Sequence, residues 1–273
     1  MPLARHSVEG ALMRYAPGSI SVSAEADIPV LRTVHRAGHL TVHQLYSALY
    51  GAREKRLWDG LAWRVGRLVR TGLLDRAEVV GLKGAVLSLG TDGELCLQGH
   101  DSSLVDRGRR MRGGNKRHQI WHDVELFEIQ LALRRAGVVT TWEAECEIRA
   151  ANDYTTDRYA KDYDAGVAFQ CGGRRGLVAL EYERTPKSSA EYERICSEIA
   201  RDQKVEIVLY LVPSRELKLF LLHALRNTRR TILIGDAREF SQSPQTAPLV
   251  DVRTQRSHVL SELLLPSSSL PSH

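Results

Sequence analysis

The spacing of apolar residues near the start of the chain predicts a first helix. Ile28, Leu31 and Val34 recur at helical intervals, and Gly38 follows them as a residue that ends helices. Asp27 stands directly before this pattern and is predicted to be the N-cap residue. The 26 residues before it contain Gly, Ser and Pro without a sustained period, so residues 1–26 are predicted to form a flexible arm.

A second helix is predicted from Thr41 to Gly51. Thr41 and Gln44 match a capping box, in which each residue's side chain accepts a hydrogen bond from the other's backbone N–H. Val42, Leu45 and Leu49 supply an apolar face for this helix. The pattern therefore predicts two short helices separated by a tight connection.

The third helix combines an apolar stripe with a strongly basic remainder. Leu61, Val65 and Leu68 lie at i, i+4 and i+7, and Gly72 ends the pattern. The cations of this helix and of the segment before it are Arg53, Lys55, Arg56, Arg64, Arg67 and Arg70. Trp58 and Trp63 stand among them. The stripe predicts burial against the first two helices, which leaves the basic side exposed.

A hairpin and a short helix are predicted after the third helix. Leu73–Val80 and Ala85–Leu89 have the composition of strands, and the turn between them carries Lys83. Thr91 then opens a helix through Leu97. Three helices followed by a hairpin is the order of a winged helix-turn-helix, whose third helix fits the major groove of duplex DNA. The alternative is that the basic helix is only a solvated surface.

The distribution of charge favours the DNA-binding interpretation. The net charge is +5 and the pI about 9.1, with the excess of cations in the first 120 residues. Residues 99–118 are predicted to be a linker that either contacts phosphates or serves as a soluble hinge. Its cations include Arg109, Arg110 and Arg112. Residues 27–98 would then be the DNA-binding domain.

The second half of the chain predicts an α/β (α+β) domain over residues 119–240. Its predicted elements are a helix at 119–136, strands at 138–142, 165–170 and 177–183, a helix at 188–200, a strand at 205–212, a helix at 214–226 and a strand at 231–234. The αβββαβ order at its core is that of the restriction-endonuclease-like fold. Residues 241–273 are rich in Pro and Ser and are predicted to form a flexible tail.

Acidic residues fall where a nuclease of this fold holds its metal ion. Asp164 opens one predicted strand, and Glu181 and Glu183 lie two apart on the next, so they share a face. Such oxygen donors suit Mg²⁺, with Asp164 and Glu181 as the metal ligands. Glu183 stands where such enzymes carry a lysine, and Lys187 is the nearest replacement. Without a lysine to polarise water, we expect metal binding without hydrolysis.

A second set of candidate ligands lies near the start of this domain. Glu125 or Glu128, on the helix at 119–136, would add a fourth carboxylate. His118 and His122 have the i, i+4 spacing of metal ligands, but a third ligand with suitable spacing is absent from the sequence. The alternative for all these residues is an ordinary polar or ion-paired role.

Several short motifs, taken in order, resemble those of the replication-relaxation family of plasmids and other mobile elements. They are L-S-L-G-T-D-G-E at Leu87–Glu94, H-D-V-E-L-F-E-I at His122–Ile129, W-E-A-E-C-E-I-R at Trp142–Arg149, D-A-G-V-A-F from Asp164 and L-E-Y-E-R-T from Leu180. The resemblance implies a winged helix joined to a degenerate nuclease-like domain. It also implies a regulator of replication, transfer or transcription.

Two functions therefore remain open from the sequence. One is a non-catalytic protein that binds double-stranded DNA, and the other is a Mg²⁺-dependent DNA endonuclease targeted by the winged helix. A third option makes the second domain a protein-binding platform, and a homodimer is open in each case. No cofactor is expected unless the acidic site is active, in which case Mg²⁺ would serve. The sequence has neither a signal peptide nor an apolar run long enough to cross a bilayer, so a cytoplasmic location is expected, without membrane or small-molecule partners.

Overall fold

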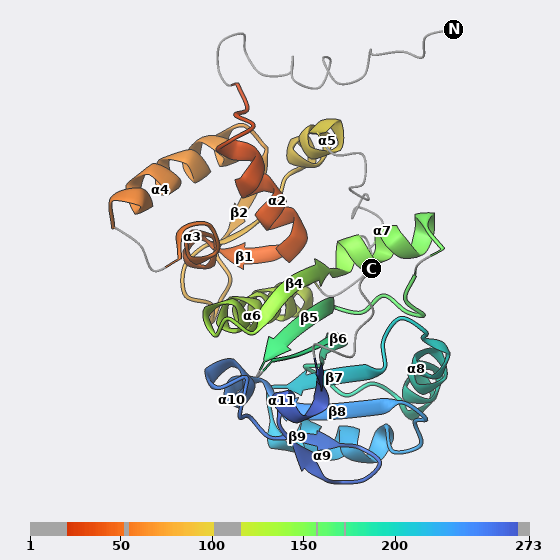
Figure 1. Cartoon of the computed structure of the whole chain (residues 1–273). Coiled ribbons are helices and arrows are strands. Elements are labelled where there is room, and N and C mark those ends of the chain that lie inside the picture. Colours follow the sequence, from red (N-terminus) through yellow and green to blue (C-terminus); the bar gives the residue numbers. More distant parts are fainter. Residues whose placement is uncertain (1–20, 52–54, 101–115, 157, 172, 267–273) are drawn as a thin grey trace, which may run out of the picture. The chain divides into compact units, whose positions relative to one another are not determined.

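A computed structural model describes residues 21–51, 55–100, 116–156, 158–171 and 173–266. The chain forms two compact units, one ending at Phe127 and the other beginning at Glu128. The first unit contains α2 (Asp27–Ala37), β1 (His39–Thr41), α3 (Val42–Tyr50), α4 (Lys55–Arg70), β2 (Leu74–Ala77), β3 (Val86–Leu89), α5 (Thr91–His100) and the start of α6 (Lys116–Arg135). Figure 1 labels these elements.

The first unit is a winged helix-turn-helix, as the sequence predicted. Its sheet has the order β1-β3-β2 and is antiparallel, with Leu87 of β3 paired to Leu40 on one side and to Arg76 on the other. Helices α2, α3 and α4 bury Leu31, Leu45 and Leu68 completely. The capping box of Thr41 and Gln44 is confirmed, because each side chain accepts the predicted backbone hydrogen bond.

Two local predictions in this unit need correction. Asp27 is the first residue of α2 and not its N-cap, which is Ala26. The Asp27 carboxylate instead accepts a hydrogen bond from the backbone N–H of Ser23 and is completely buried. Strand β1 was not predicted, because a three-residue segment between two helices has no period of its own. Strand β1 forms because it pairs with β3, far along the chain.

The start of α6 packs on the winged helix, although the sequence assigned it to the second domain. The buried His39 ring in β1 lies 2.7 Å from the Asp123 carboxylate, and the Gln44 amide donates to the carbonyl of Val124. A Cβ on Gly81 would lie 2.9 Å from the Trp121 ring, so the turn of the wing lies directly on that ring. The unit boundary thus falls inside α6 and not in the predicted linker 99–118, most of which is outside the described residues.

A fragment that ends at Gln98 is therefore expected to be less stable than one that ends at Arg135. The shorter fragment would leave His39 and Gln44 without their partners on α6 and would expose the surface under Trp121. Thermal melts followed by circular dichroism would compare the two, and the longer fragment should melt at the higher temperature. Equal melting temperatures would show that α6 contributes nothing to this unit.

The second unit is built on a mixed sheet. Its elements are the rest of α6, β4 (Val139–Ala144), α7 (Glu145–Tyr154), β5 (Ala165–Cys171), β6 (Arg174–Tyr182), α8 (Ser189–Arg201), β7 (Ile207–Val212), α9 (Arg215–Ala224), β8 (Thr231–Asp236), α10 (Ala237–Gln242), β9 (Leu249–Asp251), β10 (Ser257–His258), α11 (Leu260–Leu263) and β11 (Leu265–Pro266). The strand order is β10-β9-β8-β7-β6-β5-β4, and β11 pairs with β6. Pairs β6–β7 and β7–β8 are parallel, and the others are antiparallel.

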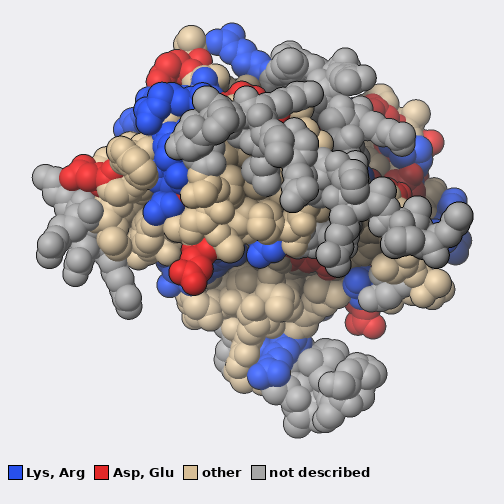
Figure 2. Space-filling view, turned by 90° about the horizontal axis from the view of Figure 1, so that it is seen from above, with Lys and Arg blue, Asp and Glu red and all other residues tan. Residues whose placement is uncertain are grey.

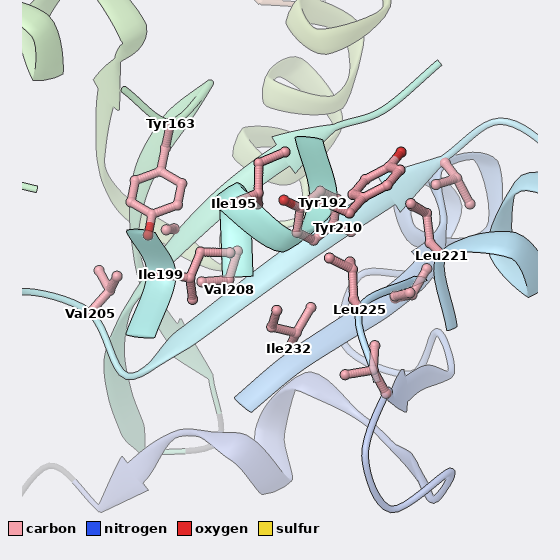
Figure 3. Packing of buried hydrophobic residues seen from close by; sticks show 14 of the residues in the cluster. Tyr163, Tyr192, Ile195, Ile199, Val205, Val208, Tyr210, Leu221, Leu225 and Ile232 are labelled. Carbon is pink, nitrogen blue, oxygen red and sulfur yellow. The ribbon is translucent and has the colours of Figure 1, made fainter. Parts of the chain in front are cut away.

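This sheet is buried on both faces. Val208, Tyr210 and Val212 of β7 belong to a cluster with residues of α7, α8 and α9, and Figure 3 shows Tyr163, Tyr192 and Tyr210 among its aliphatic members. The alternate residues of β7, Leu209 and Leu211, are equally buried and point to the opposite face. The α/β class predicted from the sequence is confirmed.

Two segments of the second unit differ from the prediction. Helix α7 was not predicted, although Glu147 accepts the backbone N–H of Ala144 as it would at a helix start. The region after residue 240, predicted to be a flexible tail, instead continues the sheet through β9, β10 and β11. Buried Leu249, Leu260 and Leu264 hold it in place. The sequence analysis missed these short strands because the region is rich in Pro and Ser.

Candidate nucleic-acid interface and acidic site

Two arginines predicted to contact DNA are held by a buried carboxylate. Asp27 accepts Arg64 Nη1 at 2.7 Å and Arg67 Nη2 at 2.5 Å. Burial by itself raises the pKa of Asp27, but the Ser23 backbone N–H and the guanidinium groups of Arg67 and Arg64 outweigh it and lower that pKa below the usual value. Arg64 and Arg67 therefore join α4 to the start of α2, which is a structural role that the sequence did not indicate.

The other predicted DNA contacts divide into exposed and undescribed residues. Arg70, at the end of α4, and Lys83, in the turn of the wing, are exposed. Lys55 and Arg56 lie in α4, but their side chains are not described. Arg53, Arg109, Arg110 and Arg112 lie outside the described residues. Their assignment to DNA binding stays a prediction.

The outward side of α4 also carries an exposed aromatic residue. Leu61, Val65 and Leu68 are buried as predicted, whereas Trp63 on the opposite side of the helix is 63% exposed. Trp58 lies instead against His43 and Tyr46. Figure 2 shows Lys and Arg side chains in a row beside a neutral surface, with Asp and Glu side chains at its margins.

Asp164 and Glu181 lie together at the junction of β5 and β6. Ala165 pairs with Leu180 in the antiparallel ladder, so the next positions outward, Asp164 and Glu181, face each other on one side of the sheet. The Asp164 carboxylate accepts the backbone N–H of Tyr182 at 2.7 Å. Of the three acids that the sequence analysis grouped, the structure thus brings Asp164 and Glu181 together.

Each glutamate of this site is paired with a lysine. The Lys161 ammonium donates to the Glu181 carboxylate, and the Lys187 ammonium donates to that of Glu183. Lys187 thus reaches Glu183 and not Glu181, and the lysine at the Asp164–Glu181 pair is Lys161, which sequence reasoning missed. The expectation that this site lacks a lysine is therefore wrong. The motif K-D-Y-D at Lys161–Asp164 was the available signal.

A hydrogen-bond network fixes the segment that presents Lys161. Asn152 of α7 donates to the Asp162 carboxylate at 2.9 Å and accepts the backbone N–H of Tyr159 at 2.8 Å. The buried Asp202 carboxylate accepts the backbone N–H of Ala160 at 2.9 Å. The segment before β5 is thus held from α7 and from the end of α8. Lys161 owes its place to tertiary contacts, which explains why its role could not be read from spacing.

Burial raises the pKa of Glu181 to about 6, with the Asp164 charge acting in the same direction and Lys161 opposing both. Tyr210, its register partner on β7, is completely buried. Burial, together with the charges of Glu181 and Glu183, raises the pKa of Tyr210 well above 10. The site thus combines a carboxyl group and a phenol whose pKa values are both raised by burial.

In the described segments, Asp164 and Glu181 form a pair of neighbouring carboxylates and not a metal centre with three protein ligands. Within those segments, no three His, Cys, Asp or Glu side chains are placed to share a metal ion. Glu128 is exposed and bound to Arg135 on the same helix, and His122 lies 3.3 Å from Asp123. The expected convergence of Asp164, Glu181 and Glu183 on one cation is therefore not observed. Two carboxylates still suit a hard cation that keeps most of its water ligands.

Comparisons with known proteins give little further information. No family model and no curated protein matches the chain, so the resemblance to replication-relaxation proteins rests on its motifs alone. One solved structure is similar, that of the restriction endonuclease FokI bound to DNA, with 12% identity and a TM-score of 0.25. The match covers 78% of this chain and 42% of the FokI chain, so this chain spans less than half of that protein. No helix of the described segments has the length and apolarity needed to cross a membrane.

Proposed function

We propose that the protein binds duplex DNA through its winged helix and regulates replication, transfer or transcription of a plasmid or other mobile element. The observation that carries the proposal is the α2-β1-α3-α4-β2-β3 order with α4 packed by one side only. In this fold the helix equivalent to α4 enters the major groove. The basic composition of its outward side suits a polyanion, and the family resemblance supports the regulatory role.

Binding of the full chain to a labelled mixed-sequence duplex, measured by fluorescence anisotropy at several salt concentrations, tests this proposal. The double variant Arg70→Ala/Lys83→Ala should bind more weakly, and its salt dependence should flatten by about one unit of slope for each lost phosphate contact. Arg64 and Arg67 do not serve this test, because their removal leaves Asp27 buried without its cations. Arg201→Ala, an exposed cation on α8, is the control. A wild type that binds no duplex would refute the proposal.

A second candidate is a Mg²⁺-dependent DNA nuclease, favoured by Lys161 beside Glu181. Asp164 and Glu181 would hold the cation, which when bound lowers the pKa of a water molecule. Lys161 would orient that water and stabilise the charge that develops on the phosphate. Lys187 is already ion-paired with Glu183, so it would contribute less to cleavage than Lys161.

Incubation with plasmid DNA in Mg²⁺ or Mn²⁺ separates the two candidates. Cleavage that is lost in Asp164→Ala and in Lys161→Ala, but kept in Lys187→Ala, would support the nuclease. Duplex binding without cleavage under the same conditions would leave the second unit as a non-catalytic module.

A further inference from the structure

The exposed indole of Trp63 is restrained by a buried charge. Arg67 lies one turn further along α4, and its guanidinium carbon is 5.4 Å from the centre of the Trp63 ring. The same guanidinium is bonded at 2.5 Å to Asp27, whose side chain has no solvent exposure. Asp27 thus positions Arg67, and Arg67 supports the ring through a cation–π contact. An aromatic side chain ordered before it meets a partner loses less entropy on binding.

Helix α4 carries a glycine, the smallest residue, on each side of the Trp63 ring. Gly60 and Gly66 stand three residues before and after Trp63. A Cβ on Gly60 would meet nothing within 4 Å, and one on Gly66 would meet only Arg70 Nη1 at 3.6 Å. Alanine would fit both positions and would favour the helix. Packing within the chain therefore does not require these glycines, whereas close approach of a partner to the helix would favour them.

The charge around Trp63 indicates an anionic partner. Besides Arg67, helix α4 contains one acid, the exposed Asp59 one turn before Trp63, against four cations: Lys55, Arg56, Arg64 and the exposed Arg70. A neutral apolar partner would leave these cations facing an uncharged surface. Duplex DNA offers phosphates to the cations and thymine methyl groups and deoxyribose carbons to the indole.

We infer that Trp63 makes a non-ionic contact with duplex DNA, with Asp27 and Arg67 as the residues that position it. The inference rests on the proposed DNA-binding function and deepens it. It reassigns Arg67, predicted to contact DNA, to the support of the neighbouring ring. It also gives Gly60 and Gly66 the role of letting α4 approach the groove wall.

Trp63→Ala is expected to weaken binding to the labelled mixed-sequence duplex by about tenfold, a loss typical of an apolar or aromatic contact. The slope of affinity against salt should not change, because tryptophan releases no counterions. Trp63→Phe should retain part of the affinity. Gly66→Ala should raise the melting temperature and yet weaken binding, because its methyl group would separate the helix from DNA. Tyr154→Ala, which removes a 78% exposed aromatic residue from α7, is the matched control and should bind normally.

Wild type and Trp63→Ala that bind the duplex equally would overturn this inference while leaving the proposed function intact. A wild type that binds no DNA would overturn the proposed function and the inference with it. A preference of the wild type for single-stranded DNA, lost in Trp63→Ala, would replace the groove contact by base stacking. A flatter salt dependence in Trp63→Ala would mean that the ring acts only by placing the cations.

Discussion

Replacing Asp27 by asparagine is expected to lower the free energy of unfolding of the first unit by about 3 kcal/mol, the usual scale for breaking a buried ion pair from one side. Asparagine keeps the size of the side chain and one acceptor oxygen, but it cannot neutralise Arg64 and Arg67 together. Urea unfolding followed by tryptophan fluorescence would measure the change, since Trp58, Trp63 and Trp121 all lie in this unit.

The pH dependence of this variant gives an independent check. The folded-state pKa of Asp27 lies below its ordinary value of 3.8, so its stabilisation is complete above pH 3.8 and is lost as the pH falls through the lower value. Wild type and Asp27→Asn should therefore converge in stability only in strong acid. Asp59→Asn, an exposed acid on α4, should change stability by no more than about 0.5 kcal/mol. Equal stability of Asp27→Asn and wild type at neutral pH would contradict the structural role of this carboxylate.

Replacing Lys161 by methionine should destabilise the second unit by about 3 kcal/mol at pH 8. The change removes the main opposing charge from Glu181, so the pKa of Glu181 rises above its present value of about 6. A carboxyl group with a raised pKa contributes stability that is complete below its ordinary pKa of 4.5 and is lost as the pH rises through the folded value. The deficit relative to wild type should therefore be small near pH 5 and should grow towards pH 8.

Lys187→Met is the matched control for this prediction. The Lys187 side chain is 38% exposed, against 14% for Lys161, so water can replace part of its interaction with Glu183. Its effect should be smaller than that of Lys161→Met. A deficit of Lys161→Met that does not vary between about pH 5 and pH 8 would show that Glu181 does not titrate in this range.

The features that the sequence predicted are those encoded within a few residues. The capping box of Thr41 and Gln44 occurs as predicted, and Ser188 and Glu191 form a second one at the start of α8, because in each box both members lie in one helical turn. The stripe of Leu61, Val65 and Leu68 has the period of a helix and is buried. Such local patterns also set the order of the main strands, and so they gave the fold class and the pairing of Asp164 with Glu181.

The features that the sequence did not predict depend on contacts between distant segments. Arg64 and Arg67 carry no local sign that Asp27, 37 and 40 residues earlier, will bind them. Lys161 reaches Glu181, 20 residues later, because its segment is tied to other elements by hydrogen bonds. The Pro and Ser content of residues 241–273 also led to a wrong prediction of a flexible tail. Short strands need only a few residues there, because they extend a sheet that other strands have already formed.

The pairing of β11 with β6 has a consequence for the synthesis of this protein. Arg174 of β6 donates to the carbonyl of Leu264, 90 residues later in the chain, and Arg175 pairs with Leu265. During translation β6 emerges from the ribosome well before its partner, whereas the strands of the winged helix lie within about 50 residues of one another. The first unit can complete its sheet on the ribosome. In the second unit, the start of β6 lacks its β11 neighbour until β11 has been synthesised, and this short edge is open to aggregation in that interval.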